Sequence, residues 1–156
     1  MAFVDRLRPE LICVRPPWET CPATVRGLVD ALVAGGALDA AQKEGATAAV
    51  LAREAESSTA LLDIRAGVPH ARLAGIAAPV AALAVSEAGL YEAVPTVHIQ
   101  IVALVLSPPA AVTDHLAMLA GISTLLRSAT LRARLLAAAT PDEAFAALAD
   151  HARTVP

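Results

Sequence analysis

One long apolar run, residues 97–106 with the sequence VHIQIVALVL, constrains the fold of this chain more than any other feature. It is rich in β-branched residues, which favour strands because they suit a pleated and buried surface. Most of the run is apolar on both of its alternating sides, as is typical of a central strand covered on both faces. The run therefore predicts a central strand of a sheet that is covered on both faces.

Further strands and helices are predicted around this run. Shorter apolar stretches bounded by glycine, proline or charge have the character of strands at residues 10–14, 60–64, 67–71 and 79–85. A first helix follows Pro22, with Thr20 or Cys21 as its N-cap, and ends at Gly35 and Gly36. Its apolar stripe consists of Val25, Leu28, Val29, Leu32 and Val33.

Three further helix starts are visible. Asp39 and Gln42 form a capping box that opens a helix reaching about Arg53. After Pro108 and Pro109, Thr113 or Asp114 caps another helix, and Thr140 with Glu143 opens the last one. We expect their buried faces to include Leu116, Leu119, Ala120, Leu125 and Leu126 in the third helix, and Phe145 and Leu148 in the last. The element order predicts a single layered α/β domain over residues 1–156.

The composition excludes several classes of protein. Although 56% of the residues are hydrophobic, Pro108 and Pro109 interrupt the most apolar run well short of the ~20 residues that span a bilayer. No secretory signal is visible, so we expect no membrane insertion and a cytoplasmic location. A net charge of −3 without a basic run predicts no nucleic-acid partner. Cys13 and Cys21 match neither a zinc nor a redox spacing, and we expect free thiols, with Cys13 buried in a strand.

Four histidines are candidates for chemistry. His151 lies in the last turn of a helix and His98 starts a strand, and we assign neither a function. His115 is placed in the first turn of a helix that follows the carboxyl end of a strand, where α/β proteins bind ligands and a helix N-terminus attracts anions. His70 follows Gly67, Val68 and Pro69, a segment that can hold a side chain rigidly at a strand end.

If His70 and His115 meet, a metal pair, an acid/base pair and a phosphorylated histidine with its helper are all conceivable. Zinc needs three or four ligands, and neither cysteine is suitably spaced, so we expect no metal and no cofactor. No G-x-S-x-G nucleophile elbow is present. The remaining interpretation is a histidine that is itself the covalent nucleophile.

Three segments in the order of one family carry a resemblance. These are LAREAESST…GVPHAR at residues 51–72, then PVAAL and SEAG, then IVALVLSPPAAVTDHLAMLAGISTLLR at residues 101–127. The chain resembles, over nearly its whole length, the enzyme IIA domain of the mannitol/fructose and nitrogen-regulatory branch of the bacterial phosphotransferase system. The resemblance implies a three-layer α/β sandwich in which a mixed, roughly five-stranded sheet carries helices on both faces.

The resemblance also implies the functional roles. His70 would accept a phosphoryl group from the histidine-containing phosphocarrier protein and pass it to an enzyme IIB domain for sugar uptake. His115 would be the second active-site histidine, and Arg53 would hold phosphoryl oxygens. The alternative is a regulatory module of the nitrogen-regulatory type that binds a target protein according to its phosphorylation state; a scaffold that has lost its chemistry is a third.

The chain departs from the family between Arg53 and His70. The family has a glycine-rich turn there, of which only Gly67 remains, and the segment is one residue longer. Arg65 either reaches the pocket and replaces lost backbone donors or is a solvated loop charge, and Arg72 poses the same question.

Overall fold

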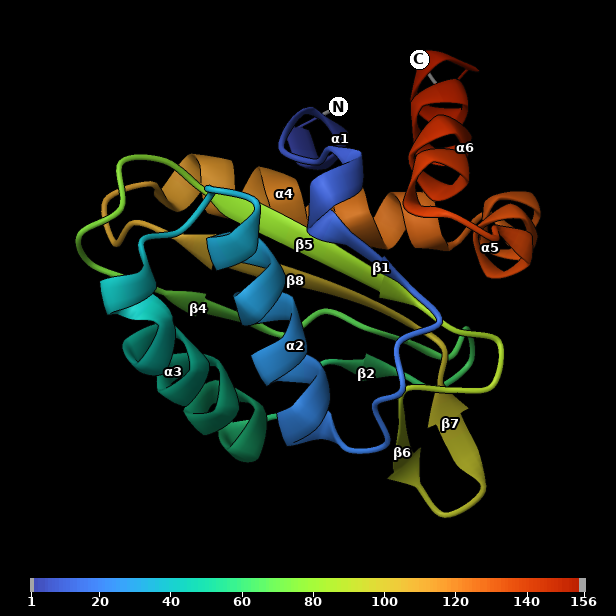
Figure 1. Ribbon diagram of the computed structural model, residues 1–156, viewed down its shortest axis with the longest axis horizontal. Coiled ribbons are helices and arrows are strands. Elements are labelled where there is room, and N and C mark those ends of the chain that lie inside the picture. The colour runs from blue at the N-terminus through green and yellow to red at the C-terminus, as the bar shows by residue number, and fades with distance from the viewer. Residues whose placement is uncertain (1, 155–156) are drawn as a thin grey trace.

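The computed structural model describes residues 2–154, and its mixed sheet lies between two helical layers (Figure 1). The strand order is β1 (Ile12–Val14), β5 (Val80–Val85), β8 (Ile101–Ser107), β3 (Ala66–Gly67) and β2 (Ala60–Leu61), and β4 (His70–Arg72) also pairs with β8. β1 and β5 are parallel, β5 and β8 antiparallel, and β3 and β4 both parallel to β8. The predicted mixed sheet is therefore confirmed.

β3 and β4 occupy one edge of β8 in succession. Ala66 and Gly67 pair with Ile101 and Val102, whereas His70–Arg72 pair with residues 105–107. Val68 and Pro69 interrupt this edge because proline has no N–H to donate to the ladder. The six strands thus fill five positions, and His70 begins β4 beside the carboxyl end of β8.

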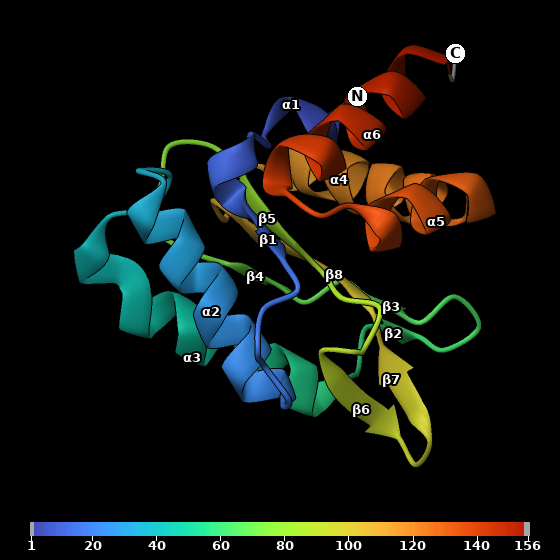
Figure 2. The same cartoon turned by 45° about the vertical axis from the view of Figure 1, so that its right-hand side comes forward.

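The helices cover both faces as predicted. On one face lie α2 (Cys21–Ala34) and α3 (Lys43–Glu56), which pack on β5 and β4. On the other lie α4 (Val112–Leu126), α5 (Ala129–Ala137) and α6 (Pro141–Thr154), with the short α1 (Ala2–Asp5) against α4 and α6 (Figure 2). None of the helices in residues 2–154 is long and apolar enough to cross a membrane.

Several predicted boundaries shift. The 10–14 stretch begins with a 3-10 turn, Pro9–Leu11, since Pro9 stands at its start, and only then becomes β1. A second 3-10 turn, Ala40–Gln42, precedes α3, and the Asp39 side chain caps that turn rather than the α-helix. The long run divides at Gln100: β7 (Val97–Ile99) leaves the main sheet to form a hairpin with β6 (Tyr91–Val94), which was not predicted.

Two predictions for α4 were wrong, one about its N-cap and one about its buried face. Its N-cap is Ala111, with no side-chain bond, so neither Thr113 nor Asp114 caps it. Leu116 is 59% exposed and Ala120 is also exposed, because the buried stripe is rotated around the helix. That stripe consists of His115, Met118, Ile122, Leu125 and Leu126. A polar histidine, which the apolar pattern did not count, thus occupies the first buried position of the helix.

Other predicted positions agree with the structure more closely. Thr20 caps α2 through the backbone N–H of Ala23, and four of the five stripe residues of this helix are buried. Leu148 is buried in α6, whereas Phe145 and Cys13 are only partly buried. Both cysteines are free, and burial raises the pKa of each thiol.

Candidate functional site

The structure brings together the three residues predicted for the site, each from a different element. Arg53 lies in the last turn of α3, His70 is the first residue of β4, and His115 lies in the first turn of α4. The ring centroids of the two histidines are 5.3 Å apart, with the ring planes inclined by 58°. Arg53 and His70 are accessible from outside, whereas His115 is only 5% exposed.

The hydrogen bonds of His70 define which of its nitrogens carries the proton. Nδ1 lies 2.8 Å from the carbonyl oxygen of Val68, which can only accept, so Nδ1 carries the proton. The Nε of Arg53 donates to Nε2 of the same ring at 3.4 Å. His70 therefore carries its proton on Nδ1, and the lone pair of Nε2 accepts a long hydrogen bond from Arg53.

The backbone of Val68 is also bound, through its N–H, to a polar cluster formed by Thr59 and Glu54. The backbone N–H of Val68 donates to the hydroxyl of Thr59 at 3.2 Å. That hydroxyl in turn donates to the carboxylate of Glu54, which also accepts from the backbone N–H of Thr59. Neither Glu54 nor Thr59 was predicted as a site residue, although both stand in the stretch that carries the resemblance.

His115 has a contrasting environment. Burial lowers its pKa to about 4, and the nearby positive charges of Arg72 and Arg53 act in the same direction. Its Nδ1 lies 2.7 Å from the hydroxyl of Ser107, the last residue of β8. His115 is thus a neutral side chain at neutral pH, packed behind the more accessible His70.

The two arginines left open by the sequence have different places. Arg72 donates from Nη1 to the carbonyls of Pro108 and Ala111, so it ties the loop before α4 to β4 beside the two histidines. Arg65 is exposed in the β2–β3 turn with φ +52°, and its carbonyl accepts from Gln100 and Ile101 at the opposite end of β8. The replaced glycine-rich segment therefore forms a hairpin whose turn points away from the site.

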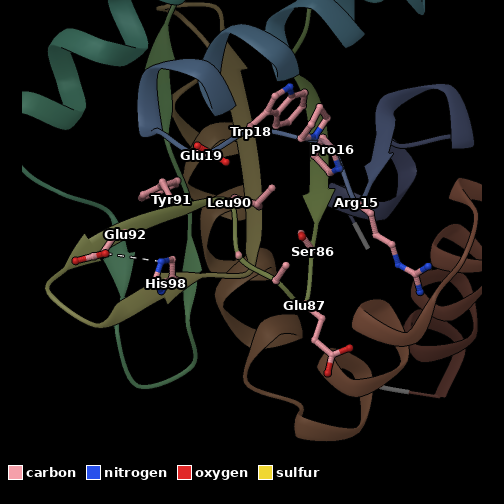
Figure 3. A pocket seen from close by; sticks show the side chains of 13 residues that line it. Arg15, Pro16, Trp18, Glu19, Ser86, Glu87, Leu90, Tyr91, Glu92 and His98 are labelled. Atoms are coloured by element: carbon pink, nitrogen blue, oxygen red, sulfur yellow. Dashed lines mark ion pairs between the residues drawn. The ribbon is translucent and has the colours of Figure 1, made fainter.

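A separate hollow lies elsewhere on the molecule (Figure 3). It has a volume of about 930 Å³ and is lined by residues including Arg15, Trp18, Glu87 and His98, beyond the carboxyl ends of β1 and β5. Because β5 runs antiparallel to β8, this hollow is at the other end of the sheet from Ser107 and the two histidines. His98 pairs there with Glu92 across the β6–β7 hairpin, and His151 lies in the last turn of α6, as predicted.

A site for a metal ion is not apparent in the described part of the chain, where no three His, Cys, Asp or Glu side chains are grouped to hold one. The two histidines with one arginine provide instead a lone pair, N–H donors and positive charge. This combination suits a nucleophile that receives an anionic group.

Comparisons with known proteins identify the family to which the chain belongs. The family model for the phosphoenolpyruvate-dependent sugar phosphotransferase system, EIIA 2, matches residues 6–151. The fructose-specific EIIA component of Haloferax volcanii is 31% identical over 130 residues, which is 83% of this chain and 82% of that protein.

Two solved structures share the fold. The nitrogen regulatory protein IIA-Ntr from Neisseria meningitidis has a TM-score of 0.79 at 19% identity, covering 95% of this chain and 99% of that one. The IIA mannitol protein of Escherichia coli has a TM-score of 0.74 at 19% identity, covering 91% and 98%. With the family model spanning nearly the whole sequence, this chain belongs to the EIIA 2 family of the phosphoenolpyruvate-dependent sugar phosphotransferase system.

Proposed function

We propose that this protein is a phosphocarrier that accepts a phosphoryl group on Nε2 of His70 from the histidine-containing phosphocarrier protein. It then passes the group to an enzyme IIB domain for sugar uptake. The observation that carries the proposal is the state of His70: Nδ1 is bound to the Val68 carbonyl, and Nε2 offers its lone pair beside Arg53. The cytoplasmic location expected from the sequence is part of this proposal.

The transfer step requires no prior deprotonation of His70. The lone pair of Nε2 gives up its long hydrogen bond from Arg53 and attacks the phosphorus of the donor's phosphohistidine. An N–P bond forms, and the donor's N–P bond breaks with its electron pair returning to the donor's ring. As the His70 ring becomes more positive, its Nδ1–H bond to the Val68 carbonyl strengthens. The carbonyl therefore supports the phosphorylated ring as well as the free one.

The developing charge on the phosphoryl oxygens calls for positioned donors. Arg53 uses only its Nε within the site, and its two terminal nitrogens have no other partner within residues 2–154. Those N–H groups can form the planar fork that suits phosphoryl oxygens. His115 adds a neutral donor, and the first turn of α4, which has no side-chain cap, adds backbone N–H groups and a positive dipole end.

Phosphorylation can be tested by intact-mass analysis after incubation with phosphoenolpyruvate, enzyme I and the histidine-containing carrier protein. We expect one acid-labile phosphate on the wild type and none on His70→Ala. The accessible His98→Ala is the matched control and should be phosphorylated normally. Phosphate on His70→Ala at the wild-type rate would show that His70 is not the nucleophile.

The acceptor is tested with the phosphorylated protein. Enzyme IIA mannitol of E. coli has a solved complex with phosphorylated enzyme IIB mannitol, and its fold resembles this chain with a TM-score of 0.73. We expect the phosphate of His70 to move to an enzyme IIB domain, first to a fructose-type one because of the Haloferax relative. A phosphorylated protein that retains its phosphate against several enzyme IIB domains would favour the regulatory alternative.

A further inference from the structure

The tautomer of His115 depends on its contact with the hydroxyl of Ser107. Ser107 ends β8, is fully buried, and lies with Oγ 2.7 Å from Nδ1 of His115. Its backbone carbonyl is occupied by the N–H of Leu73. Within residues 2–154 the Ser107 hydroxyl has no hydrogen-bond partner other than His115.

Two arrangements of the protons are conceivable between Ser107 and His115. If Nδ1 donated to Ser107, the hydroxyl proton would be buried without an acceptor, which costs about 1–3 kcal/mol. If Ser107 donates to Nδ1 instead, the hydroxyl proton and the Nδ1 lone pair satisfy each other. The second arrangement is favoured, and it leaves the single N–H of a neutral His115 on Nε2.

We propose that Ser107 is a positioning residue that fixes His115 in the tautomer with the proton on Nε2, so that His115 donates a hydrogen bond to the phosphoryl group on His70. The role in transfer rests on the proposed function, whereas the tautomer itself does not. Its geometric basis is the buried Ser107–Nδ1 bond together with the 5.3 Å separation of the two rings.

The choice of tautomer decides whether His115 helps or opposes transfer. With the proton on Nδ1, the ring would present the lone pair of Nε2 to a phosphoryl oxygen, and the two would repel. An imidazolium would carry protons on both nitrogens, but burial and the neighbouring arginines disfavour that charged form. The buried Ser107 hydroxyl, by donating to Nδ1, therefore leaves the N–H of His115 on Nε2, where it can donate to the phosphoryl group.

The two histidines are consequently held in opposite tautomers by different partners. The Val68 carbonyl accepts from Nδ1 of His70 and frees Nε2 for attack. The Ser107 hydroxyl donates to Nδ1 of His115 and makes Nε2 a donor. The first histidine is prepared as a nucleophile and the second as a hydrogen-bond donor.

The test combines the ring ¹⁵N spectrum of uniformly labelled, unphosphorylated protein at pH 7.5 with the rate of phosphoryl transfer from the carrier protein. In the wild type we expect His115 to show a protonated Nε2 and an unprotonated Nδ1. In Ser107→Ala the two nitrogens should move towards averaged values, and transfer should slow about tenfold, the value of one hydrogen bond. Ser86→Ala, which changes a buried serine at the opposite end of the sheet, should alter neither readout.

Two results would overturn the proposal. A wild-type spectrum with the proton on Nδ1 of His115 excludes it directly, whatever the variants do. If phosphoryl transfer slowed in Ser107→Ala while the His115 nitrogens kept their wild-type ¹⁵N shifts, the loss would come from packing rather than from the tautomer. The spectrum needs no phosphate, so a failure of the proposed function, seen as absence of phosphate on His70, is recorded separately.

Discussion

His70 and His115 are chemically identical side chains in contrasting surroundings. His70 is partly accessible and has a carbonyl on Nδ1 and an arginine on Nε2. His115 is buried, faces a hydroxyl, and has its pKa lowered to about 4. These neighbours, and not the imidazole itself, distinguish the proposed nucleophile from the proposed donor.

The lowered pKa of His115 predicts a pH dependence of stability. In the unfolded chain this histidine has a pKa near 6.5, so between pH 6.5 and pH 4 the unfolded state binds more protons than the folded state. Stability should therefore fall as the pH is lowered through that window, by at most about 1.4 kcal/mol for each pH unit. Urea unfolding at pH 7.5, 6 and 5 measures this loss.

The contribution of His115 is isolated by comparison with His115→Gln, whose stability should fall less over the same range. His98→Gln, which changes an exposed histidine, serves as the control and should follow the wild type. Equal slopes for the wild type and His115→Gln would contradict the prediction.

The planar guanidinium of Arg53 should matter for phosphoryl transfer in a way that a lysine cannot replace. Arg53→Lys replaces a planar fork by a point charge and should reduce the rate of phosphoryl transfer about a hundredfold, as does the loss of one transition-state donor. Because Arg53 is exposed, the free energy of unfolding should change little. Quenched-flow transfer assays give the rate, and Arg65→Lys, at the far end of β8, should transfer normally; an equal loss in both variants would refute a specific role for Arg53.

At the scale of elements, the segment between α3 and β4 combines two tasks. In its first part, the hydroxyl of Thr59 donates to the carboxylate of Glu54 in α3 and accepts from the N–H of Val68. Its second part is the β2–β3 hairpin, whose Asp63 pairs with Arg127 at the carboxyl end of α4. Only glycine fits at position 67 without a shift of its neighbours, because a Cβ there would clash with the hydroxyl of Tyr91 at 2.7 Å.

Thr59→Val should expose the importance of this connection. The variant keeps the shape of the side chain but leaves the N–H of Val68 without its acceptor and removes one of the two donors to the carboxylate of Glu54, which keeps only the backbone N–H of Thr59. We therefore expect a loss of about 1–3 kcal/mol in stability. Transfer should also slow, because the Val68 carbonyl that orients His70 is less fixed. Thermal unfolding and the transfer assay measure both effects.

Ser58→Ala is the control for Thr59→Val. Ser58 is exposed, and its hydroxyl accepts only from the N–H of Ala60. The stability and the phosphoryl-transfer rate of Ser58→Ala should remain close to those of the wild type. If Thr59→Val behaved like Ser58→Ala in both measurements, the polar cluster would not support the site.

At the scale of the whole molecule, the sheet determines where the site is. Parallel pairing places His70 beside the carboxyl end of β8, and α4 continues directly from that end, so the two histidines meet. α3 packs on β4 from the opposite face and supplies Arg53. The site thus forms where the two helical layers approach the same edge of the sheet.

A single domain over residues 1–156 remains a prediction. The buried apolar side chains of the described residues form one cluster that includes both helical layers and the sheet, and a shared core favours all-or-none unfolding. Calorimetry should give one transition whose calorimetric and van't Hoff enthalpies agree. Two separated transitions, or a proteolytic fragment that folds alone, would show more than one domain.

Patterns that depend on near neighbours in the sequence were predictable. The α2 stripe follows from helical spacing, and the central strand from a run with apolar side chains on both faces. Boundaries set by distant contacts were not: nothing local reveals that β7 turns away at Gln100, or that Leu116 faces outward while His115 faces the core. A polar residue at the first buried position of α4 makes sense only once Ser107 is placed beneath it.

The layered α/β class, the family, and the candidates His70, His115 and Arg53 could all be derived from the sequence, because apolar periodicity and short motifs are local properties. Only the folded chain shows that these three side chains meet, that Arg65 lies away from them, and that Ser107, Thr59 and Glu54 stand behind them. The physical reason is that a ring's proton and pKa depend on burial and on hydrogen-bond partners that strand pairing and helix packing bring from distant parts of the chain.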